Sequence, residues 1–161
     1  MKKLTFICTL LVLISCKKTQ NASDISAETD IQYRDSSGND LLDPSKAHSF
    51  KYNEIRHFYL TETNEKVEVS IPRTDYPKEL FIYRDIDTMP YTLRLFAHEM
   101  NAGKGITTLT DILELSDTIS DTIRSEYYVS GNGDLRIIQR VWYNNKLVND
   151  GYSLRKFVIL K

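Results

Sequence analysis

The feature that most constrains the fold is a series of short segments in which apolar and polar residues alternate. The clearest is KVEVSIP (66–72), where Val67, Val69 and Ile71 fall on one face of an extended chain. Because side chains alternate between the two faces of a strand, this pattern is typical of strands with one buried face. Comparable runs are IQYRD (31–35), EIRHFYL (54–60), ELFIYRD (79–85), YTLRLFAH (91–98), SEYYV (125–129), LRIIQRVWY (135–143) and LRKFVIL (154–160). The sequence therefore predicts an all-β fold, an antiparallel β-sandwich of Ig-like type with roughly seven to nine strands.

Turn residues between these runs predict hairpins. TETNE (61–65) and SGNGD (130–134) each separate two alternating runs. The Asn-Asn pair at 144–145 is a two-residue hairpin signal, because asparagine tolerates a positive φ, and Asp-Gly at 150–151 is another.

The hairpin around 130–134 has a predicted register. Pairing Tyr127 with Ile137 puts Ile123 and Val141 on the inner face, whereas a slip of one residue would bury arginines. The outer face then carries Arg124, Glu126, Tyr128, Arg136, Ile138, Arg140 and Trp142.

The outward Trp142, together with Tyr128 and with Arg136 or Arg140, is the candidate binding surface that the sequence offers. An exposed aromatic ring on a rigid sheet stacks on sugar rings or anchors a protein partner. The alternative is that Trp142 is covered and merely packs in a cation–π pair.

The segment 106–123 fits both helix and strand. Its apolar residues lie near helical spacing, and Thr108 with Asp111 fits a weak capping box, so one interpretation is a short helix over 108–115. The tetrapeptide SDTI occurs twice, at 116–119 and 120–123, and is expected to form turns.

The first residues predict a signal peptide. Lys2 and Lys3 precede an almost wholly apolar stretch from Leu4 to Ile14. As a helix this stretch would be about 16 Å long, well short of the roughly 30 Å hydrocarbon core of a bilayer. It therefore has the length of the apolar region of a signal peptide.

The end of this stretch resembles the bacterial lipoprotein signal. Leu13, Ser15 and Cys16 match the leucine, the small residue and the cysteine of that signal. The resemblance implies a diacylglyceryl group on the Cys16 sulfur, cleavage just before Cys16, and acylation of its amine, as by palmitate. Several acyl chains anchor a protein stably, whereas a single chain binds membranes only marginally.

The expected organisation is a signal peptide over 1–15, a flexible polar tether over 16–30 and a β-sandwich domain over 31–161. Cys8 leaves with the signal peptide and Cys16 carries the lipid. The mature chain then has no thiol left for a disulfide, a metal site or a nucleophile.

The chain also resembles small lipoproteins of Bacteroides-type bacteria, through the signal, GNDLL (38–42) and YNNK (143–146). This resemblance does not indicate any particular activity. In related systems an aspartate after the lipidated cysteine signals retention in the inner membrane, and Lys17 stands there instead. The expected location is therefore the outer membrane, on its periplasmic face or on the cell surface. The membrane itself is the expected partner of the lipid on Cys16.

No catalytic, metal or cofactor pattern accompanies this anchor. The formal net charge of −1 argues against nucleic acid as a partner. The three histidines lie far apart, and His57 is expected to be a packed or edge histidine. The acidic loop 34–44 lacks the spacing of a calcium-binding EF-hand and is expected to be a turn.

These observations favour a lipid-anchored, non-catalytic module of the cell envelope that binds a protein or a glycan without a cofactor or metal. The alternative is an envelope hydrolase whose carboxylates the fold brings together.

Overall fold

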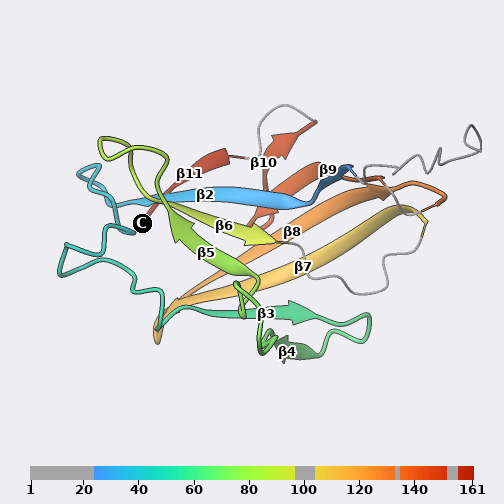
Figure 1. Cartoon of the computed structure of the whole chain (residues 1–161), viewed down its shortest axis with the longest axis horizontal. Coiled ribbons are helices and arrows are strands. Elements are labelled where there is room, and N and C mark those ends of the chain that lie inside the picture. Colours follow the sequence, from blue (N-terminus) through green and yellow to red (C-terminus); the bar gives the residue numbers. More distant parts are fainter. Residues whose placement is uncertain (1–23, 97–103, 133–134, 152–155) are drawn as a thin grey trace, which may run out of the picture.

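The computed structural model describes residues 24–96, 104–132, 135–151 and 156–161. These residues form eleven strands in two facing sheets and no helix, which confirms the predicted all-β sandwich. Figure 1 shows the smaller sheet lying across the longest strands of the larger one.

The large sheet contains seven strands of the described chain. They are β1 (Asp24–Ser26), β3 (Arg56–Leu60), β4 (Lys66–Glu68), β7 (Gly105–Ser116), β8 (Ile119–Val129), β9 (Leu135–Tyr143) and β10 (Lys146–Asp150). Their order is β1-β9-β8-β7-β3-β4, and β10 pairs with β9 as well. The register puts β1 and β10 at opposite ends of β9.

The small sheet has the order β11-β2-β6-β5. Its strands are β2 (Glu28–Arg34), β5 (Leu80–Tyr83), β6 (Thr92–Phe96) and β11 (Lys156–Leu160). The prediction of antiparallel sheets is wrong for two pairs, because β11 runs parallel to β2 and β1 runs parallel to β9. Each parallel pair joins segments from near the two ends of the described chain, which no hairpin signal could reveal.

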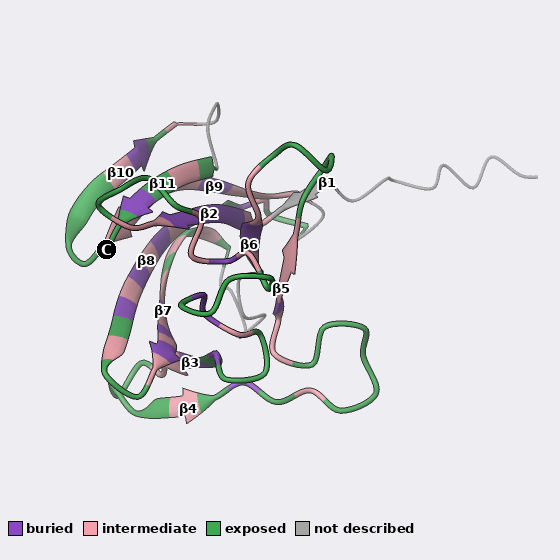
Figure 2. Cartoon of the chain, turned by 90° about the vertical axis from the view of Figure 1, so that its left-hand side faces the viewer, coloured by how far each residue is buried: buried purple, intermediate pink, exposed green. Residues whose placement is uncertain are grey.

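The core lies between the two sheets and follows the alternation of the sequence. Leu93 and Leu95 of β6 are buried on its inner face, as the pattern predicts, and they face Leu113 and Leu115 of β7 within one apolar cluster. Figure 2 shows the same alternation along β8 as buried bands separated by bands that are mostly of intermediate burial.

The interpretation of 108–115 as a helix is wrong. These residues belong to β7, which pairs with β8 from Gly105 to Ser116. Asp111, Leu113 and Leu115 are buried at every second position, a period that a strand satisfies and a helix does not. Pairing with a neighbouring strand along the full length outweighs the local capping signal.

The predicted tether is too long at its C-terminal end, because residues 24–26 form β1 and β2 begins at Glu28. The polar composition of this segment concealed its pairing. Asp30 accepts two hydrogen bonds from Arg94, at 2.8 and 2.9 Å, and one from Tyr83 at 2.9 Å. Residues 16–23 of the predicted tether, and the predicted signal peptide, lie outside the described residues.

The predicted register of β8 and β9 is wrong, although the inner face of β8 is correct. Tyr127 pairs with Ile138 rather than Ile137, and Ser125 pairs with Val141. The register shifts between Glu126 and Tyr127, which inserts one extra residue in β9. This bulge lets Ile138 and Val141, three positions apart, both point into the core, so Ile138 is buried and not on the outer face.

The Asn-Asn turn is confirmed. Asn144 and Asn145 have φ angles of 46° and 67° and connect β9 to β10. Gly151 has a φ of 108°, but the residues after the Asp-Gly pair lie outside the described residues.

Candidate functional site

The four residues of the predicted binding surface around Trp142 make different contacts in the structure. Tyr128 lies on the outer face of β8, is 38% exposed and pairs with Ile137. Arg140 bonds Asp150 at 3.1 Å and Glu126 at 3.3 Å, so its guanidinium is engaged by neighbouring carboxylates. Arg136 lies opposite Val129, at the other end of β9 from Trp142. Tyr128 and Arg136 therefore lie near one end of the β8–β9 pair and Trp142 near the other, with Arg140 between them.

Trp142 itself is half-buried. Its cation–π partner is Arg124, which the sequence did not indicate as part of the binding surface. The guanidinium carbon of Arg124 lies 4.0 Å from the centre of the Trp142 ring. Arg124 and Trp142 are directly paired across β8 and β9, and Leu147 of β10 pairs with Trp142 on its other side. The geometry corresponds to the packed cation–π alternative.

A cavity of about 580 Å³ lies where β3 separates from β7. The pairing of these strands ends at Tyr59 and Asp111, beyond which β3 turns into its hairpin with β4 while β7 continues (Figure 1). The cavity is lined by Tyr59, Leu60, Thr61, Glu62, Thr63, Asn64, Thr107, Thr108, Leu109, Thr110 and Asp111. Its volume lies within the range of small-molecule sites.

Asp111 connects this cavity to a buried ion pair. Its Oδ1 lies 2.9 Å from Nε2 of His57, and Nδ1 of His57 lies 2.8 Å from the carbonyl oxygen of Lys78. Both side chains of the pair are almost completely buried, at 0% and 1% exposure. The prediction that His57 is a packed histidine is confirmed.

The two bonds define where the protons are. The Lys78 carbonyl can only accept, so Nδ1 of His57 carries a hydrogen. Burial lowers the pKa of His57, but the hydrogen bond and charge of Asp111, the bond to Lys78 and the charge of Glu79 together raise it. The raised pKa favours the imidazolium form of His57, which donates at both nitrogens, to the Lys78 carbonyl and to Asp111.

A pH dependence follows from the raised pKa of His57. A group whose pKa is higher in the folded state stabilises the fold fully below its unfolded pKa of about 6.5, and this contribution is lost as pH rises through the folded value. We expect the free energy of unfolding to decrease above about pH 6.5. Denaturant titrations between pH 5 and 9 measure it, and an equal slope in His57→Phe would contradict the assignment.

A second buried charge lies two register positions nearer the β7–β8 turn, where Asp121 pairs with Leu113. Asp121 is 1% exposed, and its Oδ1 accepts hydrogen bonds from Tyr143 at 2.7 Å, from Asn144 at 3.2 Å and from the Lys161 ammonium. Burial and the charge of Asp121 raise the pKa of Tyr143, which keeps its proton. This cluster ties residue 161 to the large sheet and is structural.

Aromatic rings also gather on the outer face of the small sheet. Tyr76 stacks on Phe81 at a centroid distance of 4.5 Å and lies 5.5 Å from Phe96. Phe81 is in turn 5.3 Å from Tyr83. Because Tyr76 comes from the connection between β4 and β5 and covers Phe81, the group is a satellite apolar cluster under a long loop.

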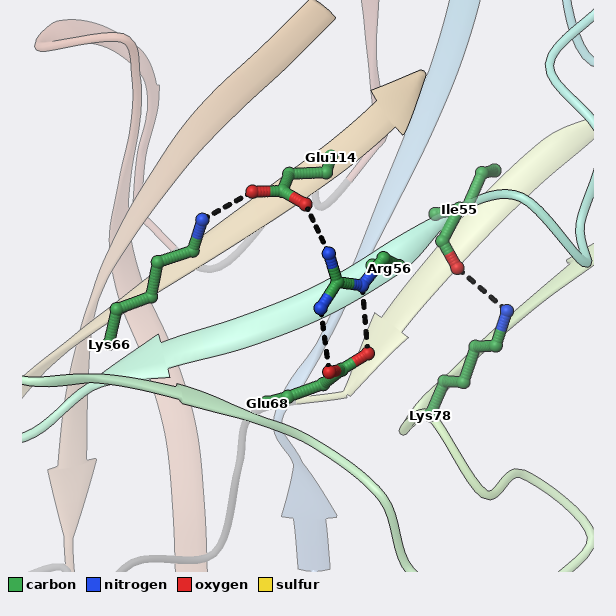
Figure 3. A network of polar contacts seen from close by, with 6 residues as sticks. All are labelled: Ile55, Arg56, Lys66, Glu68, Lys78 and Glu114. Carbon is green, nitrogen blue, oxygen red and sulfur yellow. Dashed lines mark hydrogen bonds and ion pairs between the residues drawn. The ribbon is translucent and has the colours of Figure 1, made fainter. Parts of the chain in front are cut away.

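Carboxylates meet around Arg56, as Figure 3 shows. Arg56 bonds Glu68 at 2.8 and 3.0 Å and Glu114 at 3.2 Å, and Lys66 bonds the second oxygen of Glu114. Beside this network, Glu54, Glu114 and Asp117 line a hollow of about 350 Å³. One oxygen of Glu114 therefore contacts Arg56 and the other contacts Lys66.

The acidic loop 34–44 forms turns, as predicted. Asp35 accepts hydrogen bonds from the backbone of Ser37 at 2.9 Å and of Asn39 at 2.8 Å. Asp43 accepts one from the backbone of Ser45 at 2.9 Å. Within the part of the chain that the structure describes, no three His, Cys, Asp or Glu residues are placed to hold a metal ion.

Sequence reasoning missed the importance of Asp111, which it treated as a capping residue. Asp111 and His57 are 54 positions apart and meet only because β3 pairs with β7. No local spacing could have indicated the contact. Cys16, the predicted lipid attachment site, lies outside the described residues.

The fold and the cavity define a two-sheet, all-β protein with a cavity of mixed polar and apolar lining beside the β3–β4 hairpin. No family model, curated protein or solved structure matches the chain. Over the described residues, no helix is long and apolar enough to cross a membrane.

Proposed function

We propose that the protein is a lipid-anchored, non-catalytic binding module of the cell envelope that recognises a glycan or a protein. The observation that carries this proposal is the cavity of about 580 Å³ whose wall includes the buried Asp111. The signal-like segment that ends at Cys16 supports the anchor. The outer membrane is the proposed location, because Lys17 and not an aspartate follows Cys16.

The strands bring the domain closer to the anchor than the sequence suggests. Only residues 17–23 separate Cys16 from the start of β1. Seven residues span at most roughly 25 Å when fully extended. A lipidated Cys16 would therefore hold the sandwich near the membrane surface, where it meets ligands of the envelope.

Replacing Cys16 with serine tests the anchor. Without the thiol no diacylglyceryl thioether forms, so we expect fatty-acid labelling to disappear and the protein to move from the membrane fraction to the soluble fraction. Metabolic labelling followed by fractionation measures both. Cys8→Ser is the matched control and keeps both properties, and labelling that survives in Cys16→Ser would exclude the anchor.

Capture from envelope extracts tests the binding function. The lipidated protein in vesicles is mixed with extract, and the bound material is treated separately with protease and with periodate, which destroys vicinal diols of sugars. We expect a bound species that one treatment removes. Failure to retain either kind of species would contradict a binding module.

A hydrolase acting through carboxylates is the second candidate, and the hollow beside Glu54, Glu114 and Asp117 is the place for it. Both oxygens of Glu114 are already bonded, one to Arg56 and the other to Lys66, so neither is free to exchange a proton with a substrate. The binding module is therefore the better supported function. Turnover of envelope glycans that Glu54→Gln abolishes would reverse this preference.

A further inference from the structure

We propose that the cavity beside the β3–β4 hairpin binds a neutral carbohydrate, one hydroxyl group of which donates a hydrogen bond to Oδ2 of Asp111. This inference rests on the proposed binding function and names the chemical class of its ligand. Four observations support it: the unused oxygen, the balanced charge of its ion pair, the lining of the cavity and its volume.

Oδ2 of Asp111 has no hydrogen-bond partner among the described residues, although the side chain is almost completely buried. Oδ1 already accepts the hydrogen of His57 Nε2. A buried carboxylate oxygen without a donor costs free energy, which a hydroxyl or ammonium group of a ligand would recover. Asp111 is also one of the residues that line the cavity.

The charge of the pair favours a neutral donor over a cation. The His57 imidazolium already balances the Asp111 carboxylate at 2.9 Å. An ammonium group at Oδ2 would add a second, uncompensated positive charge beside His57 in a buried setting. A hydroxyl group donates the same hydrogen bond without adding charge.

The remaining lining also matches a neutral sugar. No lysine, arginine or histidine is among the described residues that line the cavity, so an acidic ligand finds no cation there. Five threonines, Asn64 and the acidic Glu62 supply polar groups, while Leu60, Leu109 and the ring of Tyr59 supply apolar surface. A pyranose presents hydroxyl groups at its rim and C–H groups on its faces, which suits both kinds of surface.

The probe is an immobilised set of neutral oligosaccharides together with their uronic-acid and amino-sugar counterparts. The detergent-solubilised full chain is applied to this set, and calorimetric titration follows for each sugar that binds. We expect binding to neutral sugars and none to their charged counterparts.

Variants place the ligand in the cavity. Thr108→Val and Thr110→Val each remove one hydroxyl from the lining and keep a β-branched side chain, so we expect affinity to fall roughly two- to tenfold. Thr122→Val makes the same change on β8 outside the cavity and should leave affinity unchanged. Asp111→Asn removes the charge at nearly constant shape and should weaken binding roughly ten- to hundredfold.

Several results would overturn the inference. The first is that no neutral sugar binds. The second is that both threonine variants bind the sugar as tightly as the unchanged protein. The third is that Trp142→Ala abolishes binding while the threonine variants still bind. Unchanged affinity in a folded Asp111→Asn protein would mean that Oδ2 holds only a buried water. If protease alone removes the captured species, the ligand is a protein and not a sugar. That result would contradict this inference but not the proposed binding function.

Discussion

The variant His57→Phe is expected to lose about 3–5 kcal/mol of unfolding free energy. Phenylalanine fills the space of the imidazole but leaves the Asp111 carboxylate, 1% exposed, without its cation and its donor. Removing one partner of a buried ion pair is far more costly than the net contribution of the pair, because the other charge stays in a medium that solvates it poorly. Urea denaturation measures the change.

The double variant His57→Phe with Asp111→Leu separates this explanation from a loss of packing. Replacing both members of a buried pair by apolar residues of similar size is often neutral or stabilising. We therefore expect the double variant to recover most of the loss. Arg56→Gln, on the same strand but in an exposed ion pair, is the control and should change stability much less. A double variant as unstable as the single one would contradict the role of the unpaired carboxylate.

Replacing Lys161 with methionine is expected to cost about 3 kcal/mol. Asp121 would remain buried with the neutral donors Tyr143 and Asn144 but without its cation. The reverse change, Asp121→Asn, should cost less, because the Lys161 side chain is 18% exposed and can turn toward water. Thermal or urea unfolding of both variants gives the order of the two losses.

Asp117→Asn is a closely matched control for Asp121→Asn. Asp117 and Asp121 occupy the same position of the repeated tetrapeptide SDTI, but Asp117 is exposed in the turn between β7 and β8. We expect no measurable change in stability for Asp117→Asn. If both substitutions had equal effects, the contact of Asp121 with Lys161 would not be a source of stability.

Local patterns predicted most strands because each strand buries one face. Leu93 and Leu95 are buried as their alternation indicates, and the Asn-Asn turn at 144–145 has the predicted positive φ angles. The register of β8 and β9 could not be predicted, since the bulge that buries both Ile138 and Val141 breaks the period of two. The start of β2 at 28–30 was missed because its polar Asp30 is satisfied by distant partners such as Arg94.

The candidate cavity was beyond sequence reasoning for the same reason. Trp142 could be selected as an aromatic residue on an outward face, but its pairing with Arg124 depends on the register across two strands. Asp111 could not be selected, because its partner His57 and the hairpin beside it come from a segment about 50 residues earlier.

The sequence alone determined that the chain is all-β, that a tight turn forms at Asn144–Asn145, and that Cys16 follows a segment resembling a lipoprotein signal. These properties depend on periodicity and on local backbone chemistry. The tertiary structure decided which charges are buried. Two copies of SDTI place one aspartate in solvent and the other against Lys161, and Asp111 meets His57 across two strands. Burial and pairing of a charge depend on neighbours supplied by distant segments, which a local pattern does not contain.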